Sequence, residues 1–345
     1  MNDSLDDAED NDDDEVITVQ DEEKQILEFG CLLLHPHVFK FMQFLLFNQI
    51  TDSRLEFLRF LQLLSKLPHW LFLIQNLPYQ KYQFSNHLEQ WIIAYQKYPV
   101  SIDARLASVC QNPITTEYPS VSSLLGIFLI ELHKRLTSRQ YQAKHYQDTA
   151  ECNKNHAECT SYINALFDRH KKLVVLRLDL SYRKEIAESK TFEDLRDDIN
   201  KMRNNARHRD DNVFNGLDGY ICKIEYGLDK KIHAHVLFFL NGDVRLPTSD
   251  VNHAEKIGEY WKNEITKGDG VYWNCNARKK KYRYNGIGLV TRDDLEKRTY
   301  LIDAMKYLCK KERQAIKPRD KPQTKTLTRG DLRNYNPNLG RPTLT

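Results

Sequence analysis

Two histidines separated by one residue, His233 and His235, lie in an apolar run that is typical of a β-strand. Successive side chains of a strand point to opposite faces, so both imidazoles project from one face, with Cα atoms about 6.6–6.8 Å apart. Imidazole nitrogens at this spacing can bind one metal ion. Because His-x-His is a short motif, two half-exposed histidines without a metal are the alternative.

The strand that precedes this motif offers a third ligand. Residues 219–226 and 232–240 predict two strands joined by a hairpin turn at 227–230. A turn centred on Asp229 places Glu225 opposite His233, and Lys223 opposite His235. Glu225 and both histidines then share one face. The other face is almost wholly apolar, as a helix-covered core requires, with Cys222, Ile224, Tyr226, Ile232, Ala234, Val236, Phe238 and Leu240.

A later segment, residues 293–313, is typical of a helix and places a tyrosine beside a lysine. Tyr300 and Tyr307 lie seven residues apart, and Lys310 lies three residues past Tyr307, so the three share a helical face. A phenol with an ammonium group one turn away can act as a nucleophile, because the cation favours the phenolate. An amphipathic helix with an interfacial tyrosine is the alternative.

Two further stretches carry charge that could contact a polyanion. In the strand at 173–180, Arg177 and Asp179 share one face, where they could line the site, and leucines occupy the other. Segment 278–284 interleaves cations with rings, which suits contact with a nucleic-acid backbone and stacked bases; a solvated basic edge strand is the alternative. Its residues are Arg278, Lys279, Lys280, Lys281, Tyr282, Arg283 and Tyr284.

Two other metal-like patterns are weaker. His35 and His37 flank a proline in helical sequence, where neither a strand nor an acidic partner is expected. Cys152, His156 and Cys159 have no matching second pair of ligands, so we interpret them as part of a polar helix or connector.

The elements that must position these residues follow the order β-α-β-β-α-β-α. A polar helix at 192–208 follows the first strand, and the hairpin comes next. After it we expect a helix at 253–265, basic strands between 271 and 290, and the helix at 293–313. This order predicts an α+β domain in which helices cover one face of an antiparallel sheet.

The rest of the chain divides into segments of different composition. Residues 24–136 carry Leu, Phe and Ile at helical spacing, which predicts an all-α domain before the sheet domain at 171–316. Residues 137–170 are expected to be a connector, whose polar part at 137–160 could also be an exposed helix, and residues 317–345 a basic tail. Residues 1–23 contain 12 Asp+Glu and no Lys or Arg, which indicates a disordered acidic arm.

The charges of the chain are unevenly distributed. The net charge of +3 conceals the acidic arm and a body, residues 24–345, with 51 Lys+Arg against 36 Asp+Glu and a net charge of +15. Such a body indicates a polyanionic partner. The arm is either a solubilising tail or an autoinhibitory mimic of nucleic acid that covers the body.

Several protein classes are disfavoured. No apolar run approaches the roughly 18 residues of a membrane-spanning helix, and the acidic N-terminus is unlike a signal or transit peptide. Seven scattered cysteines do not suggest a disulfide framework, so we expect a reducing cytoplasm. Since the Gly-rich phosphate-binding loop of the Walker type is missing, we expect no ATPase activity.

In kind and order, these motifs resemble those of HUH endonucleases, the metal-dependent single-strand nickases of rolling-circle replication initiators and relaxases. Residues 171–310 are more closely similar to the YagK/YfjJ-type family, inovirus-like replication proteins of phages, prophages and satellites. The similarity rests on segment 176–180, on Glu225 with His233-Ala234-His235, and on the segment from Tyr307 to Lys310. It implies an RRM-like palm for the sheet domain and covers neither the helical domain nor the acidic arm.

The resemblance also implies a mechanism. Glu225, His233 and His235 would hold Mg²⁺ or Mn²⁺, a Lewis acid for the scissile phosphate of single-stranded DNA. Tyr307 would attack this phosphate, leaving a 5′-phosphotyrosyl enzyme and a free 3′-hydroxyl, and Lys310 would steady the phosphate.

The expected activity is nicking and rejoining that starts rolling-circle replication of a phage or mobile element in a bacterial host. The substrate would be an origin hairpin or nick site, and a host helicase is a candidate partner. Tyr300 is either a second nucleophile or, as we favour, a base-stacking residue. Two alternatives stay open: a non-catalytic DNA-binding regulator on the same fold, and an RNA- or DNA-binding protein that uses only the basic half. Expected DNA contacts are Arg177, Asp179, Lys223 and residues 278–283.

Overall fold

A computed structural model describes residues 62–76, 80, 82–111, 119–208, 213–227, 231–243, 250–309, 315–321 and 324–331. The chain divides into two compact units. Unit 1 comprises Met1–Tyr79 and Phe84–Tyr146, and unit 2 comprises Gln80–Gln83 and Gln147–Thr345. The acidic arm, His35 and His37 lie outside the described residues.

The described part of unit 1 is helical. It contains α4 (Leu67–Gln75), α5 (Asn86–Lys97), α6 (Ala104–Gln111), α7 (Pro119–Leu136) and the start of α8 (Arg139–Arg169). Its core includes Trp70, Trp91 and Phe128, where the Trp91 ring packs edge to face with the other two. Among all the helices described in the chain, none combines the length and apolarity needed to cross a bilayer.

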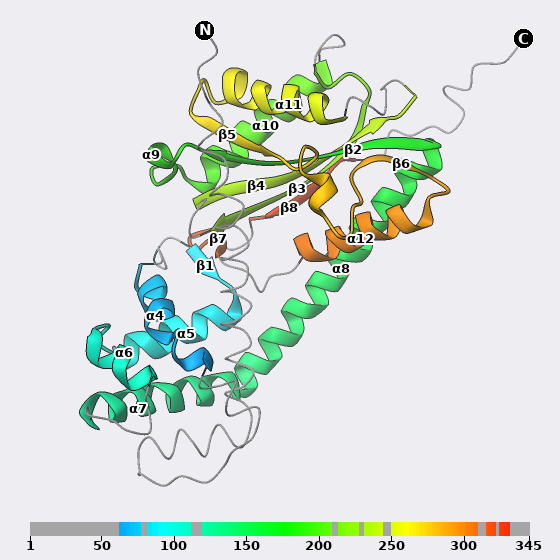
Figure 1. Cartoon of the computed structure of the whole chain (residues 1–345). Coiled ribbons are helices and arrows are strands. Elements are labelled where there is room, and N and C mark those ends of the chain that lie inside the picture. Colours follow the sequence, from blue (N-terminus) through cyan, green and yellow to red (C-terminus); the bar gives the residue numbers. More distant parts are fainter. Residues whose placement is uncertain are drawn as a thin grey trace, which may run out of the picture. The chain divides into compact units, whose positions relative to one another are not determined.

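Unit 2 is built on an antiparallel sheet that has eight strands in the described part of the chain (Figure 1). The order is β1-β7-β3-β4-β2-β5, while β6 also pairs with β2 and β8 with β3. Strand β4 is therefore central, with β2 on one side and β3 on the other. The strands are β1 (Tyr82–Phe84), β2 (Lys172–Tyr182), β3 (Leu217–Gly227), β4 (Lys231–Asn241), β5 (Gly270–Asn274), β6 (Gly288–Thr291), β7 (Ala315–Pro318) and β8 (Leu327–Arg329).

The register of the β3–β4 hairpin confirms the prediction from the sequence. Glu225 pairs with His233, and Lys223 pairs with His235. On the other side of β4, Asp179 of β2 lies opposite His235. Because side chains alternate across a strand, these five residues and Arg177 project from a single face of the sheet.

The opposite face is apolar and is covered by α10 (Phe192–His208) and α11 (Asp250–Tyr260) (Figure 1). Phe238 of β4 packs against Phe214. Tyr182 of β2 packs against Trp261, in the π-helical turn Trp261–Ile265 that continues α11. The packing of these helices on the apolar face holds the strands in place from the side opposite the polar residues. The face includes the buried side chains Leu176, Leu178, Leu180, Ile224, Ala234 and Val236.

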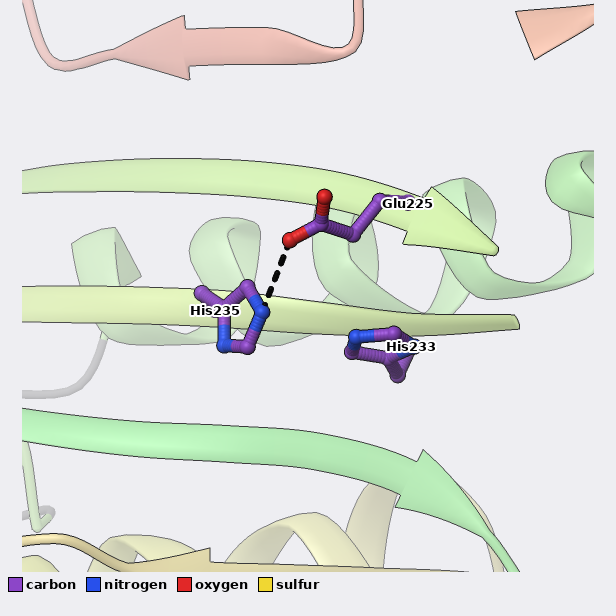
Figure 2. Close-up of side chains that lie close together, drawn as sticks. All are labelled: Glu225, His233 and His235. Atoms are coloured by element: carbon purple, nitrogen blue, oxygen red, sulfur yellow. Dashed lines mark ion pairs between the residues drawn. The ribbon is translucent and has the colours of Figure 1, made fainter. Parts of the chain in front are cut away.

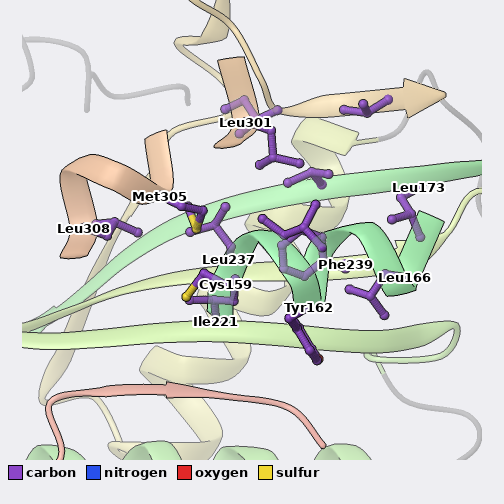
Figure 3. Close-up of a cluster of buried hydrophobic side chains, with 14 of the residues drawn as sticks. Cys159, Tyr162, Leu166, Leu173, Ile221, Leu237, Phe239, Leu301, Met305 and Leu308 are labelled. Carbon is purple, nitrogen blue, oxygen red and sulfur yellow. The ribbon is translucent and has the colours of Figure 1, made fainter. Parts of the chain in front are cut away.

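Helices also cover part of the face that carries the histidines, so the expectation of helices on one face alone was wrong. Helix α8 and helix α12 (Leu295–Cys309) pack over its apolar end, as Figure 3 shows. Leu166, Met305 and Leu308 from these helices share one buried cluster with Ile221 and Leu237 of the sheet. The sequence conceals this arrangement because the strands change from apolar to polar side chains partway along the same face.

Two expected boundaries differ from the structure. Residues 139–169 form α8, so the helical alternative for the connector is confirmed. The last turns of α8 are buried in the core of unit 2 instead of exposed, and unit 2 resumes at residue 147 rather than 171. Part of the expected basic tail forms β8, because it pairs with the edge of β3. Residues 332–345 lie outside the described residues.

The segment rich in cations also differs from the prediction. Residues 279–281 form a 3-10 helix in the connection between β5 and β6, not a strand. Both of these strands pair with β2, which leaves the connecting loop beside the middle of β2. The alternative of a basic edge strand was therefore wrong for this segment.

The contribution of α8 to the core of unit 2 can be tested with two leucine variants. Leu166→Ala should lower the free energy of unfolding by about 2–5 kcal/mol, because it leaves a cavity at a fully buried position. Leu295→Ala, at a position 70% exposed, should change it by no more than about 0.5 kcal/mol. Chemical denaturation followed by circular dichroism measures both. Equal effects of the two substitutions would contradict the placement of α8.

Candidate metal centre

The structure brings together the three residues predicted to bind a metal ion. Glu225 comes from the end of β3, and His233 and His235 come from the start of β4 (Figure 2). One ligand atom from each residue lies within 4.8 Å of the other two. Among the described residues, no other group of His, Cys, Asp and Glu meets this condition, so Cys152, His156 and Cys159 form no comparable site.

His233 is held as a neutral ligand. Its imidazole is buried, and Nδ1 lies 3.0 Å from the carbonyl oxygen of Lys231. Since a carbonyl can only accept, Nδ1 carries the proton and Nε2 keeps its lone pair. Burial, together with the positive charge of His235, lowers the pKa of His233 to about 4. This side chain is therefore ready to bind a cation at neutral pH.

His235 lies between two carboxylates. Its Nδ1 donates to Asp179 Oδ1 at 2.6 Å, and its Nε2 donates to Glu225 Oε1 at 2.8 Å. Burial by itself would lower the pKa of His235, but the two carboxylates outweigh it and raise this pKa to about 9. Burial likewise would raise the pKa of Glu225, yet the bond to His235 holds it at about 2. Without a cation, His235 is thus an imidazolium that neutralises part of the buried negative charge.

The donor set fits a divalent cation. Its two imidazole nitrogens are ligands that divalent transition metals accept, and its carboxylate oxygen is a ligand that Mg²⁺ and Mn²⁺ prefer. On binding, His235 would release its Nε2 proton, and Glu225 would exchange its bond to His235 for one to the cation. Asp179 can continue to accept from Nδ1, which is how an outer carboxylate orients a histidine ligand.

Comparison with known proteins assigns this part of the chain to a family. The model of the YagK/YfjJ C-terminal domain matches residues 135–322. The chain belongs to the YagK/YfjJ C-terminal domain family. The match starts before residue 171 and includes α8, in agreement with the place of α8 in the core. No curated protein and no solved structure gave a match.

Within the YagK/YfjJ domain, Asp179, Arg177 and Lys223 lie around the three ligand residues. The carboxylate of Asp179, one of the expected DNA contacts, accepts a hydrogen bond from His235. The Arg177 guanidinium lies 3.7 Å from the same Asp179 oxygen, and its buried Nε has no hydrogen-bond partner among the described residues. Lys223 is only 5% exposed and donates to Thr326 Oγ1, so it is a buried cation rather than an exposed DNA contact.

The residues of the basic segment have different environments. Lys279 is bound to the buried carboxylate of Asp250 at 2.5 Å, and Arg278 lies over the Trp273 ring. Tyr282 is 38% exposed, and partial burial together with the neighbouring Cys275 raises the pKa of its phenol. The exposed cations of the segment are Lys280, Lys281 and Arg283.

A buried asparagine that the sequence did not single out fixes the start of this segment. Asn276 is fully buried; its Oδ1 accepts from the Arg177 backbone N–H at 2.8 Å. Its Nδ2 donates to Val175 O and to Asp250 Oδ2. An asparagine in a loop between strands gives no signal of such a role, because its partners lie up to 101 residues away in the chain.

The tyrosine helix lies on the same face of the sheet as the metal ligands. Leu308 and Cys309, in the last turn of α12, join the buried cluster on that face, and Tyr307 belongs to the same turn. Lys310 lies outside the described residues. The Tyr300 hydroxyl donates to Glu296, and this bond raises the pKa of Tyr300. A raised pKa disfavours the phenolate, which argues against Tyr300 as a nucleophile.

The role of Asp179 predicts a specific loss of metal affinity. Asp179→Asn should weaken Mn²⁺ binding by about 10- to 100-fold, because the charged partner of His235 is removed. His235→Ala should abolish measurable binding. Asp218→Asn is the matched control, since Asp218 pairs with His170 at 2.7 Å outside the site. Calorimetric titration measures all three, and equal affinities of the two Asp→Asn variants would refute the role.

The metal-free protein should become less stable as the pH rises from about 6.5 to 9. His235 has its pKa raised to about 9 in the folded state, against about 6.5 in an unfolded chain. Its contribution to stability is therefore complete below pH 6.5 and disappears as the pH passes 9. Urea unfolding in chelator at several pH values should show a steeper decline for the wild type than for His235→Gln. Parallel curves would argue against the buried imidazolium.

Proposed function

We propose that this protein is a metal-dependent endonuclease that nicks and rejoins single-stranded DNA through a tyrosine nucleophile. The observation that carries the proposal is the Glu225, His233 and His235 cluster on the sheet face over which α12 packs. Helix α12 holds Tyr307 in its last turn. A cation site and a tyrosine helix on one face are the parts that this reaction requires.

In the proposed reaction, the Tyr307 oxygen attacks the scissile phosphorus. A bond forms between the phenolic oxygen and phosphorus, the phosphorus–O3′ bond breaks, the phenol loses its proton, and O3′ gains one. A cation held by the ligand cluster would supply Lewis-acid stabilisation of the phosphate oxygens. The resulting phosphotyrosine preserves the bond energy, so the 3′-hydroxyl can later attack it and rejoin the strand.

The residues around the ligand cluster suit a phosphate group. Arg177 presents a guanidinium beside Asp179, and its buried Nε–H can donate to a phosphate oxygen. Lys223 adds a second buried positive charge opposite His235. We assign Arg177 to contact with the phosphate and Lys223 to the electrostatic potential of the site. Lys310 is proposed, from the family resemblance, to steady the same phosphate.

The biological setting is also a proposal. Nicking with retention of the phosphate bond suits the start of rolling-circle replication of a phage or mobile element in the bacterial cytoplasm. The family resemblance implies Mg²⁺ or Mn²⁺ as the cation, and the Glu225 carboxylate suits either ion. A host helicase would unwind the duplex at the nick, because the sequence shows no phosphate-binding loop of its own.

One observation favours a second candidate function. Glu225 and His235 satisfy each other in an ion pair at 2.8 Å without any cation. Because this ion pair satisfies both side chains without a metal ion, the site is also compatible with a DNA-binding regulator that has the same fold but does not cleave DNA. The two candidates differ in whether a covalent intermediate forms.

The covalent intermediate can be detected directly. Wild-type protein, Mn²⁺ and a random-sequence pool of single-stranded DNA labelled at the 3′ end should give a labelled adduct that survives denaturing electrophoresis. The 3′ label is needed because the enzyme stays attached to the downstream fragment. Tyr307→Phe and His235→Ala should give no adduct, whereas Tyr300→Phe should retain it. An adduct of unchanged yield with Tyr307→Phe, or none with the wild type, would reject the nickase.

A further inference from the structure

Two tyrosine rings, one exposed and one partly exposed, lie together where the basic segment meets α12. Tyr284 is 59% exposed, and its ring centroid lies 5.3 Å from that of Tyr300 at an interplanar angle of 54°. The Arg283 guanidinium lies 5.2 Å from the Tyr284 centroid. At this angle the two rings do not stack face to face, and the exposure of Tyr284 leaves part of its ring open to another planar group beside Tyr300.

The ring pair is held in place by α12. The Tyr300 hydroxyl donates to Glu296, one turn earlier in the helix. Gly286 brings the loop against α12 so closely that a Cβ there would lie 2.3 Å from the Leu301 nitrogen, and Leu301 is fully buried. The loop cannot lift from the helix without breaking this close packing. A pair that is ordered in advance loses little conformational entropy when a ligand binds.

The other end of the segment is held as firmly. Lys279 is bound to Asp250, which is only 3% exposed and also accepts from the fully buried Asn276. Lys279 therefore anchors the segment, whereas the other three cations are exposed: Lys280, Lys281 and Arg283. The anchored loop therefore presents positive charge next to open aromatic faces. This combination suits a polymer that has phosphates and planar bases.

We propose that Tyr284 and Tyr300 form a stacking site for an unpaired nucleobase, and that Lys280, Lys281 and Arg283 hold the adjoining phosphates. The identity of the polymer rests on the proposed function, but binding requires neither the cation nor cleavage. Bases in a duplex are already stacked on one another, so the site selects single strands. Stacking makes no hydrogen-bond readout of the base, so binding tolerates many sequences.

The position of the site on α12 connects it to the proposed chemistry. Tyr300 precedes Tyr307 by seven residues, which is about 10 Å along a helix axis. A base stacked on Tyr284 and Tyr300 would lie within a few nucleotides of a phosphate at Tyr307. The stacking site would then fix the strand on one side of the bond to be cut.

Binding without cleavage tests this proposal. Fluorescence anisotropy in chelator would compare a labelled 20-nucleotide poly(dT), an abasic strand of equal length and a 20-base-pair duplex. The double variant Tyr284→Ala/Tyr300→Ala should bind poly(dT) roughly 5- to 150-fold more weakly, the range expected when one base loses its stacking partner. Its affinity for the abasic strand and for the duplex should not change. Tyr284→Phe/Tyr300→Phe should keep wild-type affinity, and Tyr146→Ala, which removes a ring 76% exposed elsewhere, is the control.

The lysines should respond differently. Lys280→Gln/Lys281→Gln should weaken binding to all three polymers and reduce the salt dependence for single strands by about 0.7 for each phosphate that is no longer neutralised. Wild-type affinity of the Ala/Ala tyrosine variant for poly(dT), or an equal loss on the abasic strand, would overturn the stacking site. If wild type and Tyr307→Phe bind alike but no adduct forms with Mn²⁺, only the nickase fails and the stacking site stands.

Discussion

The fold of unit 2 places a histidine on the central strand of a sheet with one carboxylate on each neighbouring strand. His235 of β4 lies opposite Asp179 of β2, and it bonds to Glu225 of β3 through its other nitrogen. Buried carboxylates of like charge would repel each other, and burial alone would favour their neutral forms. The imidazolium between them removes that cost, so the ligands can be assembled before any cation binds.

The sheet face that carries the site also carries half of the core. Ile221 and Leu237 belong to the buried cluster, while Glu225 and His235, on the same two strands, belong to the site. Helix α12 is anchored in that cluster through Leu301. The cation ligands and the tyrosine helix are thus positioned by one continuous body of packed side chains. A catalytic arrangement needs such support, because small displacements of reacting groups cost much of the rate.

The sequence predicted the contacts between residues that are close together in the chain, but not the contacts between residues that are far apart in it. The β3–β4 register was predictable because the two strands are adjacent in the chain and their alternation permits one register only. The helix at 192–208 was predictable from its own periodicity. The partnership of Asp179 with His235 was not, because it depends on β2 lying next to β4, 56 residues away in the chain. The burial of Lys223 was hidden for the same reason, since β8 pairs with β3 from about a hundred residues later.

The buried charges of the metal-free site indicate how a divalent cation and then a phosphate would bind there. Asp179 and Glu225 face three positive side chains, namely His235, Arg177 and Lys223. Exchange of the His235 proton for a divalent cation would raise the local positive charge by one. The site would then be most positive when the cation is bound. A phosphate could approach it because both carboxylates would already be bound to positively charged groups. Under the proposed function, metal binding would therefore strengthen the attraction of the polyanion, and the net positive charge of residues 24–345 would add to it.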